Sequence, residues 1–187
     1  MCTFKKIAVT NRLLCEDGLL RQLTRIAEID CPDFVILREK DLSEKEYETL
    51  ARQVMKICRE NRMECILHSY PDVARRLGCP AIHMPFKAYR RQWKELQDFS
   101  LRGTSVHSEE EAVWAQAHGV SYVTAGHIYL TDCKKGLPAR GVDFLTAVCE
   151  AVSIPVYAIG GITPERLDEV KRTGAGGACM MSEYMKI

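Results

Sequence analysis

Residues 155–173, PVYAIGGITPERLDEVKRT, contain the pattern that decides the fold. Residues 156–159 are apolar and rich in β-forming side chains, which predicts a buried strand. The Thr-Pro pair at 163–164 predicts the start of a helix, because proline is favoured in the first helical turn. The Gly-Gly pair at 160–161 joins the two. This stretch therefore encodes one strand–turn–helix unit.

The same order of elements recurs along the whole chain. Predicted strands cover residues 7–10, 34–38, 65–68, 81–84, 101–106, 122–125, 156–159 and 177–181. Amphipathic stretches that begin near residues 19, 43, 72, 90, 108, 142 and 163 separate them. Ser43, with Glu46 three residues on, predicts a capping box, and Ser108, followed by three glutamates to Glu111, predicts a second helix cap. Several strands are almost entirely apolar, as in parallel sheets buried on both faces. Eight repeats favour a (β/α)₈ TIM barrel over an open doubly wound sheet.

Length and composition limit the classes of protein to consider. We expect residues 1–187 to form a single TIM-barrel domain. Since only residues 182–187 follow the last predicted strand, we expect the eighth helix to be short or absent. The net charge of +1 predicts no nucleic-acid or membrane partner. No apolar run approaches the ~18 residues of a membrane span, and the N-terminus does not resemble a signal peptide, so we expect a cytoplasmic protein. The nine cysteines include no C-x-x-C pair and are interpreted as small buried hydrophobes of a reduced protein, with Cys133 the exception because it lies in a polar loop.

Polar side chains gather where the predicted strands end, which is where barrel enzymes carry their chemistry. Gly160 and Gly161 lie before a helix start, so their N–H groups suit a phosphate, and Ser182 after the last strand adds a hydroxyl. An ordinary glycine turn is the alternative. Arg38 and Lys40 are one strand period apart and suit a carboxylate or phosphate, with Glu39 turned away, unless they belong to a solvated charge run.

The loop at 126–141 follows a buried strand and carries one imidazole, His127, followed by Lys134. A histidine has an ordinary pKa of about 6.5, which suits a base at neutral pH. A structural or exposed histidine is the alternative. The remaining histidines show no metal-ligand spacing with Asp or Glu, so no metal site is predicted.

Six segments together resemble the thiamin phosphate synthase/TenI superfamily of (β/α)₈ barrels, almost from end to end. They are residues 7–11, 36–42, 103–108, the loop from Gly126, 155–162 and 174–177. The superfamily holds a synthase, which joins a pyrimidine diphosphate to a thiazole phosphate with Mg²⁺, and a thiazole tautomerase, which aromatises a carboxythiazole phosphate.

Departures from the synthase pattern favour the tautomerase, an isomerase. The synthase has Asn-Asp after the third strand and an Asp after the fourth. This chain has Ser69-Tyr70 after the third strand, and residues 84–88 at the end of the fourth, which finish at Ala88, include no acidic residue. Both Mg²⁺ carboxylates are therefore missing. His127 replaces a proline of the synthase loop, and the resemblance implies that it is the base of a 1,3-proton shift.

The predicted site contains one catalytic residue and a set of substrate-binding residues, with no metal and no cofactor. We expect His127 as the base. The substrate-binding set is Arg38, Lys40, Ser105, Thr131, Lys134, Gly160, Gly161, Met181 and Ser182. The substrate implied is a phosphorylated thiazole, and a homo-oligomer that covers the short C-terminus is compatible with the pattern. The alternatives are a thiamin phosphate synthase and a non-catalytic TenI-like regulator.

Overall fold

The computed structural model describes residues 4–131 and 136–187. Its strands are β1 (Lys5–Val9), β2 (Phe34–Leu37), β3 (Glu64–His68), β4 (Ala81–Pro85), β5 (Leu101–Val106), β6 (Tyr122–Gly126), β7 (Val156–Ile159) and β8 (Gly177–Met180). Its α-helices are α1 (Leu19–Asp30), α2 (Glu44–Glu60), α3 (Pro71–Leu77), α4 (Phe86–Gln92), α5 (Glu109–Ala117), α6 (Gly141–Ala151), α7 (Leu167–Arg172) and α8 (Ser182–Met185). Among the described residues there are also the 3₁₀ turns η1 (Arg12–Leu14), η2 (Trp93–Leu96) and η4 (Pro164–Arg166).

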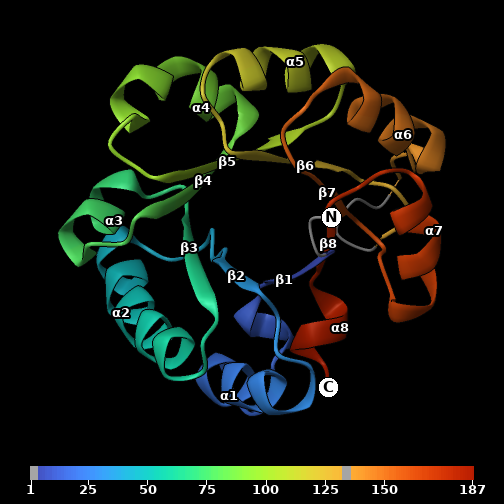
Figure 1. Cartoon of the computed structure of the whole chain (residues 1–187). Helices are drawn as coiled ribbons and strands as arrows, with labels where there is room; N and C mark the ends of the chain where they lie inside the picture. Colours follow the sequence, from blue (N-terminus) through green and yellow to red (C-terminus); the bar gives the residue numbers. More distant parts are fainter. Residues whose placement is uncertain (1–3, 132–135) are drawn as a thin grey trace. The chain divides into compact units, whose positions relative to one another are not determined.

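The strands form a closed barrel in the order β1 to β8 (Figure 1). The pairings β1–β2, β2–β3, β3–β4, β5–β6, β6–β7 and β7–β8 are all parallel. The predicted TIM barrel is confirmed, and so is the short last helix, since α8 has four residues. The sequence analysis did not predict η1, which follows the end of β1. Among the described residues, no helix combines the length and the apolar character needed to cross a bilayer.

The chain divides into two compact units. The β1–β3 unit comprises residues 6–83 and 181–187, and the β5–β8 unit comprises the described residues 4–5 and 84–180. The single domain predicted from the sequence stays a prediction.

In the β1–β3 unit, α1 and α2 cover the strands with apolar faces. Leu23 and Ile26 of α1 and Val54 of α2 are fully buried. Each such side chain contributes about 1.5–3 kcal/mol relative to an exposed position. Ser43 begins α2 with the predicted capping box, because its hydroxyl accepts from the Glu46 N–H and its own N–H donates to the Glu46 carboxylate. Local sequence therefore fixes the start of α2, and packing holds the helix in place.

In the β5–β8 unit, the strand register leaves little room for side chains at particular glycines. Gly103 pairs with Tyr122, and a Cβ added at Gly103 would lie 2.1 Å from the Tyr122 ring. Gly126 pairs with Ile159, and a Cβ there would lie 2.3 Å from the Ile159 carbonyl oxygen. Ser108 caps α5 as predicted by accepting from the Glu111 N–H. Glycine is thus needed where the strands approach side chains and backbone closely.

Candidate active site

Arg38, Glu39 and Lys40 lie in the loop that follows β2, which ends at Leu37. Arg38 is half-buried and Lys40 is exposed, whereas Glu39 has an exposed fraction of only 3%. The Glu39 carboxylate accepts hydrogen bonds from the Thr10 hydroxyl at 2.7 Å and from the Arg12 backbone N–H at 3.0 Å. The prediction that Glu39 turns away from its two basic neighbours agrees with this burial. The sequence pattern did not predict its partners.

Arg12 ties this loop to η1. Its guanidinium donates to Glu39 at 3.2 Å and to both carboxylate oxygens of Asp41, at 2.7 and 2.6 Å. Thr10 also accepts the backbone N–H of Arg38 at 2.9 Å, so one hydroxyl links Arg38 to Glu39. Bidentate Arg–carboxylate contacts fix geometry well. The backbone that carries Arg38 is therefore held from two sides.

Two buried histidines lie next to Arg38 in the same unit. His68 ends β3 and His83 lies opposite it in β4, and their rings stack at 5.5 Å with an interplanar angle of 19°. Burial and then the charges of His83 and Arg38 lower the pKa of His68 well below its usual range. Burial and then Arg38 lower the pKa of His83 to about 3. Both imidazoles are consequently neutral at neutral pH, and they do not add to the positive charge of Arg38.

The residues that replace the family's metal ligands have other partners. The Ser69 hydroxyl lies 2.7 Å from Nδ1 of His68. The Tyr70 ring packs against that of Tyr47, with centroids 4.3 Å apart and a tilt of 35°, and its hydroxyl donates to the Leu42 carbonyl. Ala88, on α4, has no side-chain oxygen. Magnesium requires oxygen ligands in octahedral geometry. Ser69, Tyr70 and Ala88 offer no carboxylate, so these residues do not fit the Mg²⁺ of the synthase. Within residues 4–131 and 136–187, no group of three His, Cys, Asp or Glu side chains suits a metal.

His127 follows β6 and belongs to a loop that continues to pair with β7. The N–H of Ile128 donates to the Ile159 carbonyl, and the N–H of Tyr129 donates to the Gly160 carbonyl, both at 3.0 Å. His127 is half-buried, and its Nε2 lies 3.4 Å from the Leu137 carbonyl oxygen. A Cβ added at Gly160 would lie 2.3 Å from the Cβ of His127. The structure thus places His127 directly against the glycine turn.

Gly160 and Gly161 both adopt positive φ angles, of 100° and 65°. A Cβ added at Gly161 would lie 2.6 Å from the Leu130 carbonyl oxygen and 2.8 Å from the Cβ of Tyr129. Only glycine combines this backbone conformation with such close neighbours. The two glycines are therefore required by the loop that carries His127, beside any role in binding.

The other predicted binding residues are distributed over both units. Ser105 lies in β5, and its hydroxyl accepts from the Thr124 hydroxyl at 3.1 Å. Thr131 is half-buried at the end of the described part of its loop, and Lys134 lies outside the described residues. Met181 and Ser182 belong to the β1–β3 unit, where Ser182 is exposed and begins α8. The structure thus groups Arg38 with the two histidines, and His127 with the two glycines.

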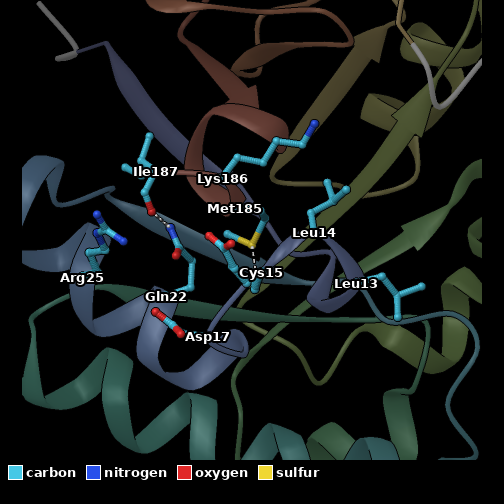
Figure 2. A pocket seen from close by; sticks show the side chains of 10 residues that line it. Leu13, Leu14, Cys15, Asp17, Gln22, Arg25, Met185, Lys186 and Ile187 are labelled. Atoms are coloured by element: carbon cyan, nitrogen blue, oxygen red, sulfur yellow. Dashed lines mark hydrogen bonds between the residues drawn. The ribbon is translucent and has the colours of Figure 1, made fainter.

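A cavity of about 480 Å³ lies in the β1–β3 unit, and the sequence analysis missed it (Figure 2). The Gln22 amide donates to the carbonyls of Tyr184 and Ile187, at 2.6 and 2.9 Å, and Cys15 lies 3.6 Å from the Met185 sulfur. The lining comes from η1, α1 and the C-terminal segment: Leu13, Leu14, Cys15, Glu16, Asp17, Gln22, Arg25, Met185, Lys186 and Ile187. None of the predicted site residues lines it, and no sequence motif marks it.

The fold and these strand-end groups define a (β/α)₈ barrel with basic side chains and a glycine turn at its strand ends. Residues 7–184 match the family model described as thiamine monophosphate synthase, and the chain belongs to this family.

Known proteins of this family resemble the chain over nearly its whole length. The chain is 30% identical to thiamine-phosphate synthase 2 of Streptococcus pneumoniae, over 95% of this chain and 86% of the relative. It is 29% identical to thiamine-phosphate synthase of Clostridium botulinum, over 95% and 88%. Among solved structures, thiamine phosphate pyrophosphorylase from Pyrococcus furiosus superposes with a TM-score of 0.84 at 25% identity, covering 98% of this chain and 88% of that one.

These names correct the predicted function. The sequence analysis predicted a thiazole tautomerase, an isomerase, whereas the similar proteins carry the name of a synthase, which is a transferase. The prediction was wrong because it assigned a reaction from residue types alone: the absence of carboxylates at Ser69, Tyr70 and Ala88, and a histidine in the loop after β6. A histidine in place of a proline does not specify a base, and the contact that the structure gives the His127 ring is a backbone carbonyl, that of Leu137.

Proposed function

We propose that this protein joins a pyrimidine diphosphate to a thiazole phosphate, the reaction of a thiamine-phosphate synthase. The match of residues 7–184 to that family is the observation that carries the proposal. The reaction has two anionic substrates, and the chain has two groups of residues suited to anions. One is Arg38 with Lys40, and the other is the turn at Gly160 and Gly161.

Arg38 and Lys40 are proposed to bind the diphosphate. The guanidinium of Arg38 is half-buried next to two neutral histidines, so its charge attracts an anion more strongly than it would in water. The neutral rings of His68 and His83 can also donate or accept hydrogen bonds. The backbone contacts of Thr10 and Glu39 hold Arg38 before the substrate arrives, which reduces the cost of ordering it.

The second substrate is proposed to bind by its phosphate at Gly160 and Gly161. Backbone N–H groups of glycine turns bind phosphates because nothing shields them. His127, against the same turn, then lies beside the phosphorylated substrate. Ser105, Thr131 and Lys134 complete the proposed set of binding residues.

The bond changes define what the site must do. A ring nitrogen of the thiazole supplies an electron pair to the methylene carbon of the pyrimidine, and the bond from that carbon to the diphosphate oxygen breaks. The diphosphate leaves with the bonding electrons, and the product is a thiazolium. Positive groups at the departing oxygen stabilise the charge that develops there. Arg38 and Lys40 are proposed for this role.

Incubation of the protein with the two substrates tests the proposal. We expect thiamin phosphate and diphosphate in equal amounts, quantified by chromatography. Arg38→Met is expected to raise the KM for the pyrimidine diphosphate about ten-fold or more, the loss of one hydrogen bond to a charged group. Arg21→Met, an exposed position on α1 of the same unit, is the matched control and leaves KM unchanged. Binding of both substrates without product would overturn the proposal.

Parallel titrations in Mg²⁺ and in EDTA test whether basic side chains, and not a metal ion, bind the diphosphate. Because the described residues do not fit a carboxylate-held Mg²⁺, we expect wild-type protein to bind inorganic diphosphate in EDTA within about three-fold of its affinity in Mg²⁺. Calorimetric titration with sodium diphosphate measures this without any turnover. A dependence on Mg²⁺ of more than about a hundred-fold would contradict the assignment of diphosphate binding to basic side chains.

A further inference from the structure

Three side chains connect the glycine turn to α7, and none of them has a role in the proposed function. Tyr129, in the loop after β6, donates its hydroxyl to the Glu169 carboxylate at 2.5 Å. The guanidinium of Arg166 lies 4.2 Å from the centre of the Tyr129 ring. Arg166 also donates to the Gly161 carbonyl at 2.5 Å. One connected set of contacts therefore joins the β6 loop, η4 and α7.

These contacts hold the carbonyls of two successive peptides. The Gly160 carbonyl accepts the Tyr129 N–H at 3.0 Å, and the Gly161 carbonyl accepts from Arg166. In a planar trans peptide, the C=O and the N–H of the next residue point in opposite directions. The N–H groups of Gly161 and Ile162 are consequently directed away from Tyr129 and Arg166. A pair of N–H groups with fixed directions is what a phosphate requires.

The interactions of the three side chains reinforce one another. Burial, followed by the hydrogen bond to Glu169, raises the pKa of Tyr129 to about 12, so its hydroxyl stays protonated and remains a donor. The stacked ring keeps the Arg166 guanidinium near the Gly161 carbonyl, because a cation is attracted to an aromatic face. Glu169 in turn fixes the ring from α7. The Arg166 guanidinium contacts the Tyr129 ring and the Gly161 carbonyl, so we expect it to affect phosphate binding through the position of Gly161.

We infer that Tyr129, Arg166 and Glu169 form a clamp that positions the Gly160–Gly161 turn for the phosphate group of the substrate. This inference rests on the proposed function, because it deepens the role given there to the turn. All three are positioning residues. None of them was predicted from the sequence, since they lie up to 40 positions apart.

Phosphate titration is the direct test of the clamp. Arg166→Met removes the donor to Gly161, and we expect the affinity for inorganic phosphate to fall about ten-fold, as for the loss of one charge-assisted hydrogen bond. Tyr129→Phe keeps the ring but loses the contact with Glu169, and we expect a decrease of about three-fold. Arg166→Lys, which retains a cationic donor, is expected to recover part of the loss. Arg91→Met, exposed on α4 of the same unit, is the matched control.

Kinetics separate positioning from a general structural effect. We expect Arg166→Met to raise the KM for the thiazole phosphate about ten-fold, while the KM for the pyrimidine diphosphate changes less than about two-fold. The unphosphorylated thiazole alcohol should show no difference between the variant and wild type. Thermal unfolding of each variant shows whether it is folded at the assay temperature. If Arg166→Met is not folded there, the milder variant Tyr129→Phe provides the test of the clamp.

The outcomes distinguish this inference from the proposed function. Wild-type protein that binds phosphate but makes no thiamin phosphate would overturn the proposed function and leave the clamp standing. Unchanged phosphate affinity in Arg166→Met and Tyr129→Phe, with normal synthesis by wild type, would overturn the clamp alone. An equal rise of both KM values, or no phosphate binding by wild type, would also contradict the clamp.

Discussion

Replacement of Glu39 by glutamine removes the acceptor that joins three parts of the β1–β3 unit. The carboxylate has an exposed fraction of 3% and accepts from the Thr10 hydroxyl, the Arg12 backbone and the Arg12 guanidinium, at distances of 2.7, 3.0 and 3.2 Å. A glutamine keeps one acceptor oxygen and places an NH₂ group where a donor was bound. At least one buried donor then has no acceptor.

The magnitude follows from these contacts. An unsatisfied buried donor costs about 1–3 kcal/mol. The Arg12 side chain is 28% exposed and keeps its contacts with Asp41, so no buried charge is left alone and the effect stays near the middle of that range. We expect Glu39→Gln to lower the free energy of unfolding by about 2 kcal/mol, which for a domain of this size lowers the Tm by about 4–8 °C.

Thermal and urea unfolding monitored by circular dichroism measure this change. Asp41→Asn is the matched control, because Asp41 also binds Arg12 but its side chain is 54% exposed, and we expect a clearly smaller decrease in Tm. Glu39→Gln should also raise the KM for the pyrimidine diphosphate, since Thr10 links Glu39 to the Arg38 backbone. A Tm within about 1 °C of wild type would refute the argument that this buried carboxylate organises the loop.

Two further perturbations test other parts of the structure. Gly161→Ala places a Cβ 2.6 Å from the Leu130 carbonyl oxygen, so we expect a loss of phosphate affinity and a lower Tm. Gly136→Ala is the control, because Gly136 also has a positive φ, of 80°, but a Cβ there has no neighbour within 4 Å. It should change stability less. His83 binds a proton in the unfolded chain below its ordinary pKa of about 6.5 but in the folded protein only near 3, so stability decreases as the pH falls through this interval. Between about pH 7 and pH 5, His83→Asn should abolish about 2 kcal/mol of that loss in urea unfolding, and an unchanged pH dependence would argue against a buried neutral His83.

The sequence predicted the order of the elements and most helix starts because these depend on neighbours along the chain. The exception is α4, which begins at Phe86 and not near residue 90, and which gives way to η2 at Trp93. The apolar runs predicted β5 and β7 with the observed bounds, and the capping residues Ser43 and Ser108 were recognised from the residues three positions further on. The repeat of eight such units was enough to predict the barrel. Even the short α8 followed from the few residues after the last strand.

The reaction could not be predicted in the same way. The sequence analysis took a histidine in the loop after β6 as a tautomerase base, and the relatives corrected this to the name of a synthase. A residue type shows which groups a side chain carries. It does not show what the side chain faces, and for His127 that is the Leu137 carbonyl and the Gly160 turn.

By itself the sequence determined that this protein is a (β/α)₈ barrel with basic residues and glycines at its strand ends, because periodicity, capping and turn chemistry are local properties. Only the tertiary structure decided which of these residues are held in place. Glu39 meets Thr10 across 29 positions, and Tyr129 meets Glu169 across 40. Such contacts arise when strands distant in the sequence pair side by side, and no spacing along the chain encodes them.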